Sequence, residues 1–222
     1  MIRIAATEVS HWHSLHDAAY LRHLAAMPDV QLVGVQDPSA EVAAKRAAAL
    51  GNPPVFTDYR QMLAETRPDF VVALGRHSVM AETAHYLLDH GYPFLMEKPM
   101  GISAGEVRGI ADKADARKAF VAVPLAQRYQ PFVARARQLL AEGRLGPLSH
   151  FLALKDGVLR LVTAGGEETA PGQPPEPLAL LALRDALMHW RRGEPAPIGV
   201  ADCARVAVLI DHAYDLAARA AE

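Results

Sequence analysis

The chain of 222 residues is poor in cysteine and in aromatic residues, and it has no long apolar run. Its single cysteine, Cys203, excludes an internal disulfide. No apolar run approaches the roughly 20 residues that a membrane-spanning helix needs. The first four residues, Met-Ile-Arg-Ile, do not open a basic segment followed by a long apolar one. We therefore expect a cytoplasmic protein with no membrane partner.

An excess of charge of one sign is also lacking. The net charge is −2, and no block of lysine and arginine stands out, which removes any general attraction to nucleic acid. The hydrophobic content of 51% is that of a globular protein, but much of it is alanine and only 6% of the residues are aromatic. These proportions predict a helix-rich core with few large rings. We expect a small molecule as the partner.

Short apolar runs alternate with helical stretches through the first half of the chain. Strands are expected at residues 2–6, 30–36, 55–56, 69–75, 94–96 and 119–123. Helices are expected at residues 13–27, 58–66, 80–90 and 103–118, the last with a capping box of Ser103 and Glu106, and in the alanine-rich stretch after residue 39. Strands separated by helices need right-handed parallel crossovers. The fold class predicted for residues 1–124 is α/β, a doubly wound parallel sheet of the nucleotide-binding type.

Residues 125–222 predict a smaller α+β part. A helix is expected at residues 131–142, a strand at 149–154, and a hairpin of residues 158–163 and 167–170. A proline-rich loop at 171–177 precedes two helices at 178–190 and 201–221. A sheet this small is marginal alone, and its edge and apolar face would meet water. We therefore expect a homo-oligomer.

A charged pair, Glu97 and Lys98, follows the apolar strand expected at residues 94–96. Because ligands of open α/β sheets bind beyond the carboxyl ends of the strands, this pair is expected to face the ligand crevice. Pro99 restricts the backbone and biases Lys98 toward extended angles. The alternative is a surface ion pair that happens to follow a strand. Lys98 is the leading candidate for a functional residue.

The order of several motifs resembles that of the Gfo/Idh/MocA oxidoreductase family. They are Asp37-Pro38, the region of Tyr59, Met96-Glu97-Lys98-Pro99, Arg128-Tyr129-Gln130-Pro131 and Glu142-Gly143-Arg144-Leu145-Gly146. The resemblance covers about residues 2–151 and the last helices from residue 178. It implies a Rossmann domain that binds NAD or NADP over residues 1–124, and a shortened C-terminal domain for substrate and oligomerisation over residues 125–222.

The resemblance also implies an activity, namely hydride transfer to or from a hydroxyl of a sugar-like or polyol substrate. It places Lys98 beside the nicotinamide and the substrate hydroxyl as a proton relay, with Glu97 orienting it, and it assigns Arg128 to the cofactor site. Asp37 ends the second strand, where a carboxylate can accept hydrogen bonds from the adenosine ribose and would repel a 2′-phosphate. NAD is therefore favoured over NADP. The alternative for Asp37 is an ordinary Asp-Pro turn before a helix.

The first turn departs from the family pattern. Residues 6–13 read Ala-Thr-Glu-Val-Ser-His-Trp-His and contain no glycine to let the backbone approach a pyrophosphate. A helix that begins here would still offer N–H groups, so we expect phosphates to be held by Thr7, Ser10, His11 and His13. After the fourth strand the chain has Gly75-Arg76-His77 in place of Thr-Pro-Asn. These three residues are expected to contact the cofactor, the alternative being a solvated loop.

The second domain departs further. The family's Gly-Gly-Gly stretch, followed by an Asp and a catalytic His, has no counterpart between residues 154 and 178. The alternative function is a catalytically impaired nucleotide-binding or assembly module that has lost the substrate sheet. His11, His13, His16 and Asp17 are of types that bind zinc, but they begin a predicted helix and lack a firm fourth ligand, so we expect no metal. Cys203, on an alanine-rich helix, is expected to be a small buried thiol.

Overall fold

The computed structural model describes residues 1–143, 150–153, 159–163, 166–170, 174 and 176–220. The chain divides into two compact units, one of Met1–Pro124 with Leu183–Glu222 and the other of Leu125–Ala182. This division differs from the predicted boundary, which placed all residues after 124 in one domain. The difference arises because the last two helices pack on elements of the first unit, as described below.

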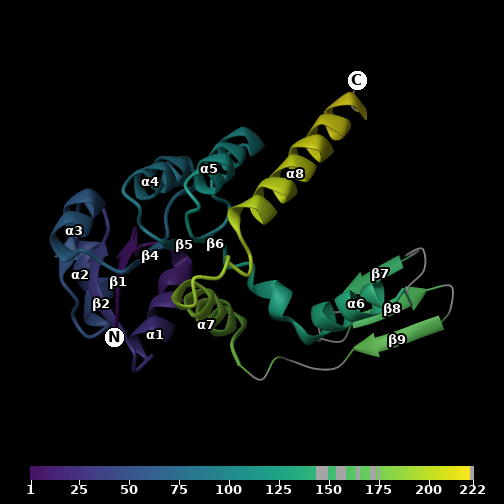
Figure 1. Ribbon diagram of the computed structural model, residues 1–222, viewed down its shortest axis with the longest axis horizontal. Helices are drawn as coiled ribbons and strands as arrows, with labels where there is room; N and C mark the ends of the chain where they lie inside the picture. The colour runs from purple at the N-terminus through teal and green to yellow at the C-terminus, as the bar shows by residue number, and fades with distance from the viewer. Residues whose placement is uncertain (144–149, 154–158, 164–165, 171–173, 175, 221–222) are drawn as a thin grey trace. The chain divides into compact units, whose positions relative to one another are not determined.

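The first unit contains a six-stranded sheet in the order β3-β2-β1-β4-β5-β6, with every neighbouring pair parallel (Figure 1). The strands are β1 (Ile2–Thr7), β2 (Val30–Gln36), β3 (Val55–Phe56), β4 (Phe70–Ala73), β5 (Phe94–Met96) and β6 (Val121–Ala122). The predicted α/β fold class is therefore confirmed. The strand order reverses between β1 and β4, and such a switch point opens a ligand crevice at the carboxyl ends of the strands.

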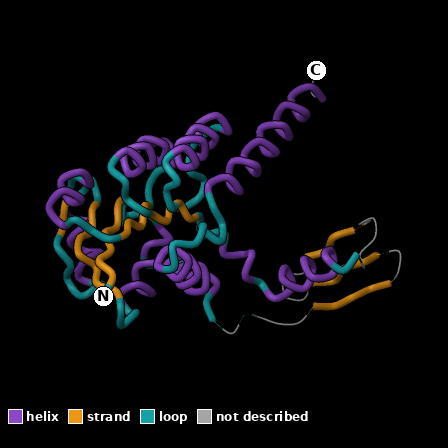
Figure 2. The backbone as a smooth tube through the Cα atoms, viewed as in Figure 1, coloured by secondary structure: helices purple, strands orange, loops and turns teal. Residues whose placement is uncertain are grey.

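The strands at the centre of the sheet are buried on both faces. All four residues of β4 are buried, and so are all three of β5, as their continuous apolar sequences require in a parallel sheet. Helices cover both faces of this sheet, with α3 (Tyr59–Thr66), α4 (His77–Asp89) and α5 (Ala104–Ala116) along one face and α1 (Tyr20–Ala25) and α7 (Leu178–Arg191) along the other (Figure 1 and Figure 2).

Side chains cap the N-termini of three helices, of which the sequence predicted the cap at Ser103. Ser39 caps α2 (Ala40–Ala48), Asp58 caps α3 (Tyr59–Thr66) and Ser103 caps α5 (Ala104–Ala116). The capping box at Ser103 is incomplete, because the Glu106 carboxylate accepts from the N–H of Ile102 at 2.8 Å. Helix α4 (His77–Asp89) begins three residues earlier than predicted.

The helix predicted at residues 13–27 is wrong in its first half. The chain forms a single 3₁₀ turn at Trp12–Ser14, then an irregular segment, and only then the short helix α1 (Tyr20–Ala25). Asp17 and Ala19 adopt positive φ angles of 52° and 47°, which a continuous helix does not allow. The reason is tertiary, since bonds to the end of β2 fix the start of this segment.

The second unit contains the 3₁₀ turn η2 (Ala126–Tyr129), the helix α6 (Pro131–Ala141) and an antiparallel sheet. That sheet has the order β7-β8-β9, with strands β7 (His150–Ala153), β8 (Leu159–Thr163) and β9 (Gly166–Ala170). The predicted strand and hairpin are therefore present. The turn of the hairpin was predicted at residues 164–166; Gly166 begins β9, and residues 164–165 lie outside the described residues, as does most of the proline-rich loop at 171–177.

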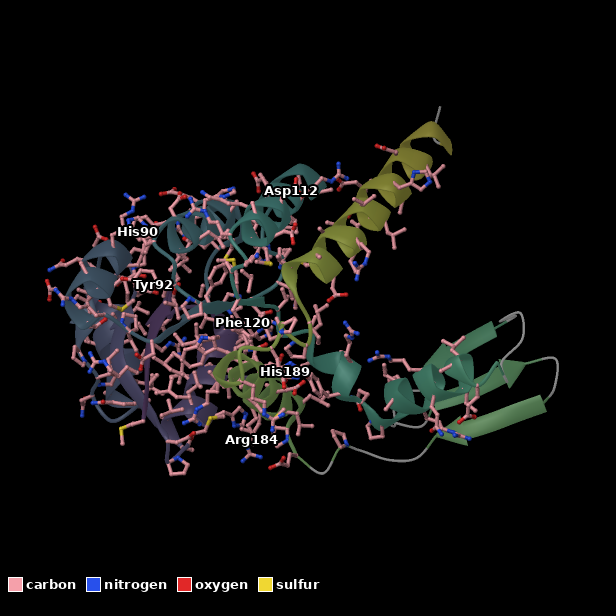
Figure 3. The ribbon with its side chains drawn as sticks, viewed as in Figure 1. His90, Tyr92, Asp112, Phe120, Arg184 and His189 are labelled. Atoms are coloured by element: carbon pink, nitrogen blue, oxygen red, sulfur yellow. The ribbon has the colours of Figure 1, made fainter. Side chains whose placement is uncertain are left out.

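Helices α7 (Leu178–Arg191) and α8 (Val200–Ala220) end the chain. The Trp190 ring lies 5.2 Å from that of Phe70, which also contacts the Phe120 ring at 6.0 Å. Phe120 is labelled in Figure 3. Helix α8 packs along α5, and an antiparallel bridge joins Ala122 of β6 to Gly199. The closing segment from Leu183 therefore belongs with the first unit. Within the described part of the chain, each helix is too short or too polar to cross a membrane.

Candidate functional site

Two hollows lie at the carboxyl ends of the strands in the first unit, each with a volume of about 280 Å³. The first is lined by Glu8, Ser10, His11, Gly75, Arg76 and His77. The second is lined by residues after β2 and β3 and by residues of α4, among them Gln36, Pro38, Thr57, Tyr59, Val79 and Thr83. Glu8 and Arg76 line both hollows, so the two are neighbours along the edge where the fold places its ligand crevice.

The first hollow gathers five of the predicted cofactor-binding residues from two distant places in the sequence. Ser10 and His11 come from the turn after β1, and Gly75, Arg76 and His77 come from the turn after β4. They meet because β1 and β4 are adjacent parallel strands that end at the same edge of the sheet. Their chemistry suits a phosphate-bearing ligand, since guanidinium, imidazole and hydroxyl groups are all donors.

Glu8, which was not among the predicted site residues, is bonded to Arg76. Its carboxylate accepts from the backbone N–H of Arg76 at 2.9 Å and from the guanidinium Nε at 3.3 Å and Nη2 at 3.2 Å. Glu8 has a φ of 41°, a conformation that favours glycine, and it stands in the turn where glycine was missing from the sequence. The feature of the sequence that could have indicated Glu8 is its position as a carboxylate directly after a buried strand.

The backbone N–H groups of the first turn are already engaged. Glu8 donates to the Gln36 side-chain oxygen at 3.1 Å, and Val9 donates to the Gln36 carbonyl at 3.0 Å. Ser10 donates to the Asp37 carboxylate at 2.8 Å. In the common dinucleotide-binding turn these groups and the start of the following helix face the pyrophosphate. Here they face the end of β2, and α1 begins only at Tyr20, so this turn can offer a ligand only donors on its side chains.

Asp37 is buried, with 3% of its surface exposed. One carboxylate oxygen accepts the Ser10 N–H, and the other accepts the Ser39 N–H at 3.1 Å. The second bond is that of an Asp turn before a helix, which was the alternative interpretation of this residue. The ribose-binding role of Asp37 stays a prediction, and any ribose hydroxyl would share these oxygens with two backbone donors.

A second cluster surrounds Glu97, which directly follows β5 and is 1% exposed. One oxygen of its carboxylate accepts the N–H of Lys98 at 3.0 Å, and the other lies 3.2 Å from Nδ1 of His13. The other ring nitrogen of His13, Nε2, lies 3.2 Å from the Asp17 carboxylate. His13 therefore lies between two carboxylates. Burial raises the pKa of the nearby Tyr20 hydroxyl, and the Glu97 charge raises this pKa further.

Lys98 stands at the carboxyl end of β5, as predicted, and its side chain is exposed. Its peptide bond to Pro99 is cis. Burial lowers the pKa of the His11 imidazole below its ordinary value of 6.5; the Glu97 charge opposes the shift, and the charges of His13, His77 and Lys98 add to it. Lys98 therefore lies within electrostatic reach of His11, a residue of the first hollow.

Thr7 and Arg128 are two further residues of the predicted set. The Thr7 hydroxyl is buried and donates to the Leu74 carbonyl at 3.1 Å, so it bonds within the sheet. Arg128 lies in η2 of the second unit, and its role in cofactor binding stays a prediction. Among the described residues, the histidines and acids near the first turn do not form a group of three that could hold a metal ion.

The strand order, the parallel pairing and the position of the hollows define a Rossmann-type α/β protein. A family model described as "Oxidoreductase family, NAD-binding Rossmann fold" matches residues 8–125, more than half of the chain. The chain belongs to this Gfo/Idh/MocA oxidoreductase family.

Two curated relatives of the chain are dehydrogenases by name. The trans-1,2-dihydrobenzene-1,2-diol dehydrogenase of Oryctolagus cuniculus is 33% identical over 129 residues, which are 56% of this chain and 39% of that protein. The D-xylose 1-dehydrogenase (NADP(+)) of Hypocrea jecorina is 26% identical over 98 residues, 44% of this chain and 25% of that protein. The chain thus spans between a quarter and two fifths of the length of these relatives.

Solved structures share the fold at low sequence identity. An oxidoreductase from Agrobacterium radiobacter, solved with NAD+, L-tartaric acid and magnesium, is 10% identical with a TM-score of 0.78, covering 98% of this chain and 96% of that one. A putative myo-inositol dehydrogenase from Sinorhizobium meliloti 1021 is 15% identical with a TM-score of 0.73, covering 95% of each chain.

Proposed function

We propose that the chain is an NAD-dependent dehydrogenase that acts on a hydroxyl group of a sugar-like or polyol substrate. The observation that carries this proposal is the first hollow, where donors of the β1 and β4 turns line one space and Lys98 follows β5, the strand next to β4. Family membership and dehydrogenase relatives support the same reaction class. NAD, when bound, accepts the hydride of an alcohol or returns it to a carbonyl.

The chain's own residues have distinct roles in this proposal. Lys98 exchanges the proton of the substrate hydroxyl, and its exposure lets that proton pass on to solvent. Glu97 holds the backbone of Lys98 through the bond at 3.0 Å and is a positioning residue. Arg76, His11, His77 and Ser10 supply donors to the phosphates, while the carboxylates at the end of β2 and in the first turn disfavour a 2′-phosphate.

The test combines binding with turnover. NAD and NADP are titrated by calorimetry, and a panel of sugars and polyols is then assayed by the absorbance of the reduced nicotinamide. We expect NAD to bind more tightly than NADP. Lys98→Ala should abolish turnover while it changes the Kd for NAD by less than about threefold, because the lysine acts on the substrate proton. Lys45→Ala, at an exposed lysine in the last turn of α2, is the control and should leave both unchanged.

Other outcomes separate the two functions. NAD binding without turnover over the whole panel would favour a nucleotide-binding or assembly module, the alternative raised by the missing second-domain motif. Failure of both NAD and NADP to bind would contradict both functions. The homo-oligomer expected from the small second sheet is tested separately, by light scattering across a concentration series.

A further inference from the structure

Glu8 and Arg76 are the two residues that line both hollows, and they are bonded to each other. We propose that Glu8 sets the affinity for dinucleotides, because its carboxylate holds Arg76 and must be displaced before a pyrophosphate can bind there. This inference rests on the proposed function, since it concerns the same groove. It assigns to Glu8 a role opposite to that of the glycines that usually occupy this turn.

The geometry of the pair supports such a role. Three donors of Arg76 converge on one carboxylate, and the Glu8 side chain is only 13% exposed, whereas that of Arg76 is 69% exposed. The bond from Glu8 N–H to Gln36 fixes the backbone that carries the carboxylate. A Cβ at position 75 would lie 3.2 Å from the Glu8 carboxylate, so Gly75 leaves the space that the carboxylate approaches.

The chemistry of the groove explains why the Glu8–Arg76 pair would control the affinity for a pyrophosphate. Arginine binds phosphate and carboxylate in the same two-pronged manner, so the two anions compete for one guanidinium. The N–H groups of Glu8, Val9 and Ser10 are engaged by β2 and offer no replacement donors. A pyrophosphate that reaches this part of the groove therefore meets the Glu8 carboxylate, which repels it, and the Arg76 guanidinium, which is already bonded to Glu8.

The first experiment compares two matched charge removals, Glu8→Gln and Glu82→Gln. Glu82 also lines the second hollow, but it bonds to Arg60 at 2.7 Å and not to Arg76. Calorimetry with NAD should show a Kd that is lower by roughly three- to tenfold in Glu8→Gln, a range that allows for solvent screening of the exposed guanidinium. Glu82→Gln should change this Kd by less than about twofold.

Ligand probes show which part of the dinucleotide responds. Inorganic pyrophosphate should bind more tightly to Glu8→Gln by a similar factor, whereas adenosine, which carries no phosphate, should bind both proteins equally. In an Arg76→Ala background the gain from Glu8→Gln should disappear, because the two residues act through one bond. Circular dichroism checks the fold of each variant, and Glu8→Gly, which suits the positive φ, provides a second variant.

The results distinguish failure of the role proposed for Glu8 from failure of the dehydrogenase proposal. If NAD binds to the wild type and Glu8→Gln equally well, Glu8 has no such role while the dehydrogenase proposal stands. Glu8 likewise has no such role if adenosine gains as much affinity as NAD. If NAD binds only to Glu8→Gln, the inference is supported and the dehydrogenase proposal fails for the wild type. If no variant binds NAD, both proposals fail.

Discussion

Oε2 of the buried Glu97 carboxylate lies 3.2 Å from Nδ1 of His13, and neither atom makes a hydrogen bond to another described group. The two atoms lie at ion-pair distance without the geometry of a hydrogen bond, so a proton on Nδ1 would face the carboxylate charge. Because an unpaired buried polar atom is costly, we infer that His13 carries its proton on this nitrogen. This contact links the turn after β1 to the end of β5, on which Lys98 stands.

Glu97→Gln should lower the free energy of unfolding by about 1–3 kcal/mol, because it replaces a buried acceptor facing the His13 ring with a neutral amide. Urea denaturation measures the change. Glu82→Gln, at an exposed ion pair, should cost less than about 0.5 kcal/mol. In a His13→Ala background the effect of Glu97→Gln should be smaller, and equal effects in both backgrounds would mean that the contact does not stabilise the fold.

The lowered pKa of His11 predicts a pH dependence of stability. Between this lowered pKa and 6.5 the unfolded state binds more protons than the folded state, so stability falls as the pH decreases through that window. His11→Gln should make the melting temperature less sensitive to acidification, by an amount equivalent to less than about 1 kcal/mol because the ring is partly exposed. His90→Gln, at an exposed histidine, is the control. A larger fall in melting temperature on acidification in His11→Gln than in the wild type would contradict the prediction.

Cys203 is 8% exposed, and burial raises the pKa of its thiol, an effect that the backbone of Met100 partly opposes. Since only the thiolate attacks thiol reagents, native protein should react at least about tenfold more slowly than protein unfolded in urea. Labelling followed by mass spectrometry measures both rates. Rapid, complete labelling of the native protein would show that the packing of α8 on α5 does not protect the thiol. The sequence-based expectation of a small buried thiol agrees with the structure.

Two Gly→Ala substitutions should have opposite effects on stability. A Cβ at Gly34 of β2 would lie 2.9 Å from Cγ of the buried Met62, so Gly34→Ala should destabilise by about 1–3 kcal/mol. A Cβ at Gly109, inside α5, meets nothing within 4 Å, so Gly109→Ala should stabilise by about 0.5–1 kcal/mol. Chemical denaturation measures both. Similar effects at the two positions would mean that the backbone preference of alanine, and not the contact with Met62, determines the change in stability at Gly34.

Local patterns were enough to predict most of the fold. The apolar runs at β2, β3 and β5 and the cap at Ser103 were recognised from neighbouring residues alone. Crossover rules then gave the parallel sheet, because they hold for any alternation of strands and helices. The turn after β1 could not be predicted in this way. Its path depends on hydrogen bonds to β2 that join residues 27 and 28 positions apart in the sequence.

The candidate site shows the same limit. Position at a strand end and the family resemblance indicated Arg76 and His77, and the structure places both beside the β1 turn. Glu8 was missed because its partner lies 68 residues away in the sequence, and no local pattern relates the two. The roles of Lys98 and Glu97 stay predictions until binding and turnover are measured.

The placement of β1 between β2 and β4 has a consequence for synthesis on the ribosome. Ile4 pairs with Leu32 on one side and with Phe70 on the other, so the first strand to emerge is completed only when the fourth arrives. Until then one row of its backbone donors and acceptors stays open to other nascent chains. Fragments that stop before residue 70 should accumulate as aggregates, and chaperone demand should be greatest in this interval of translation.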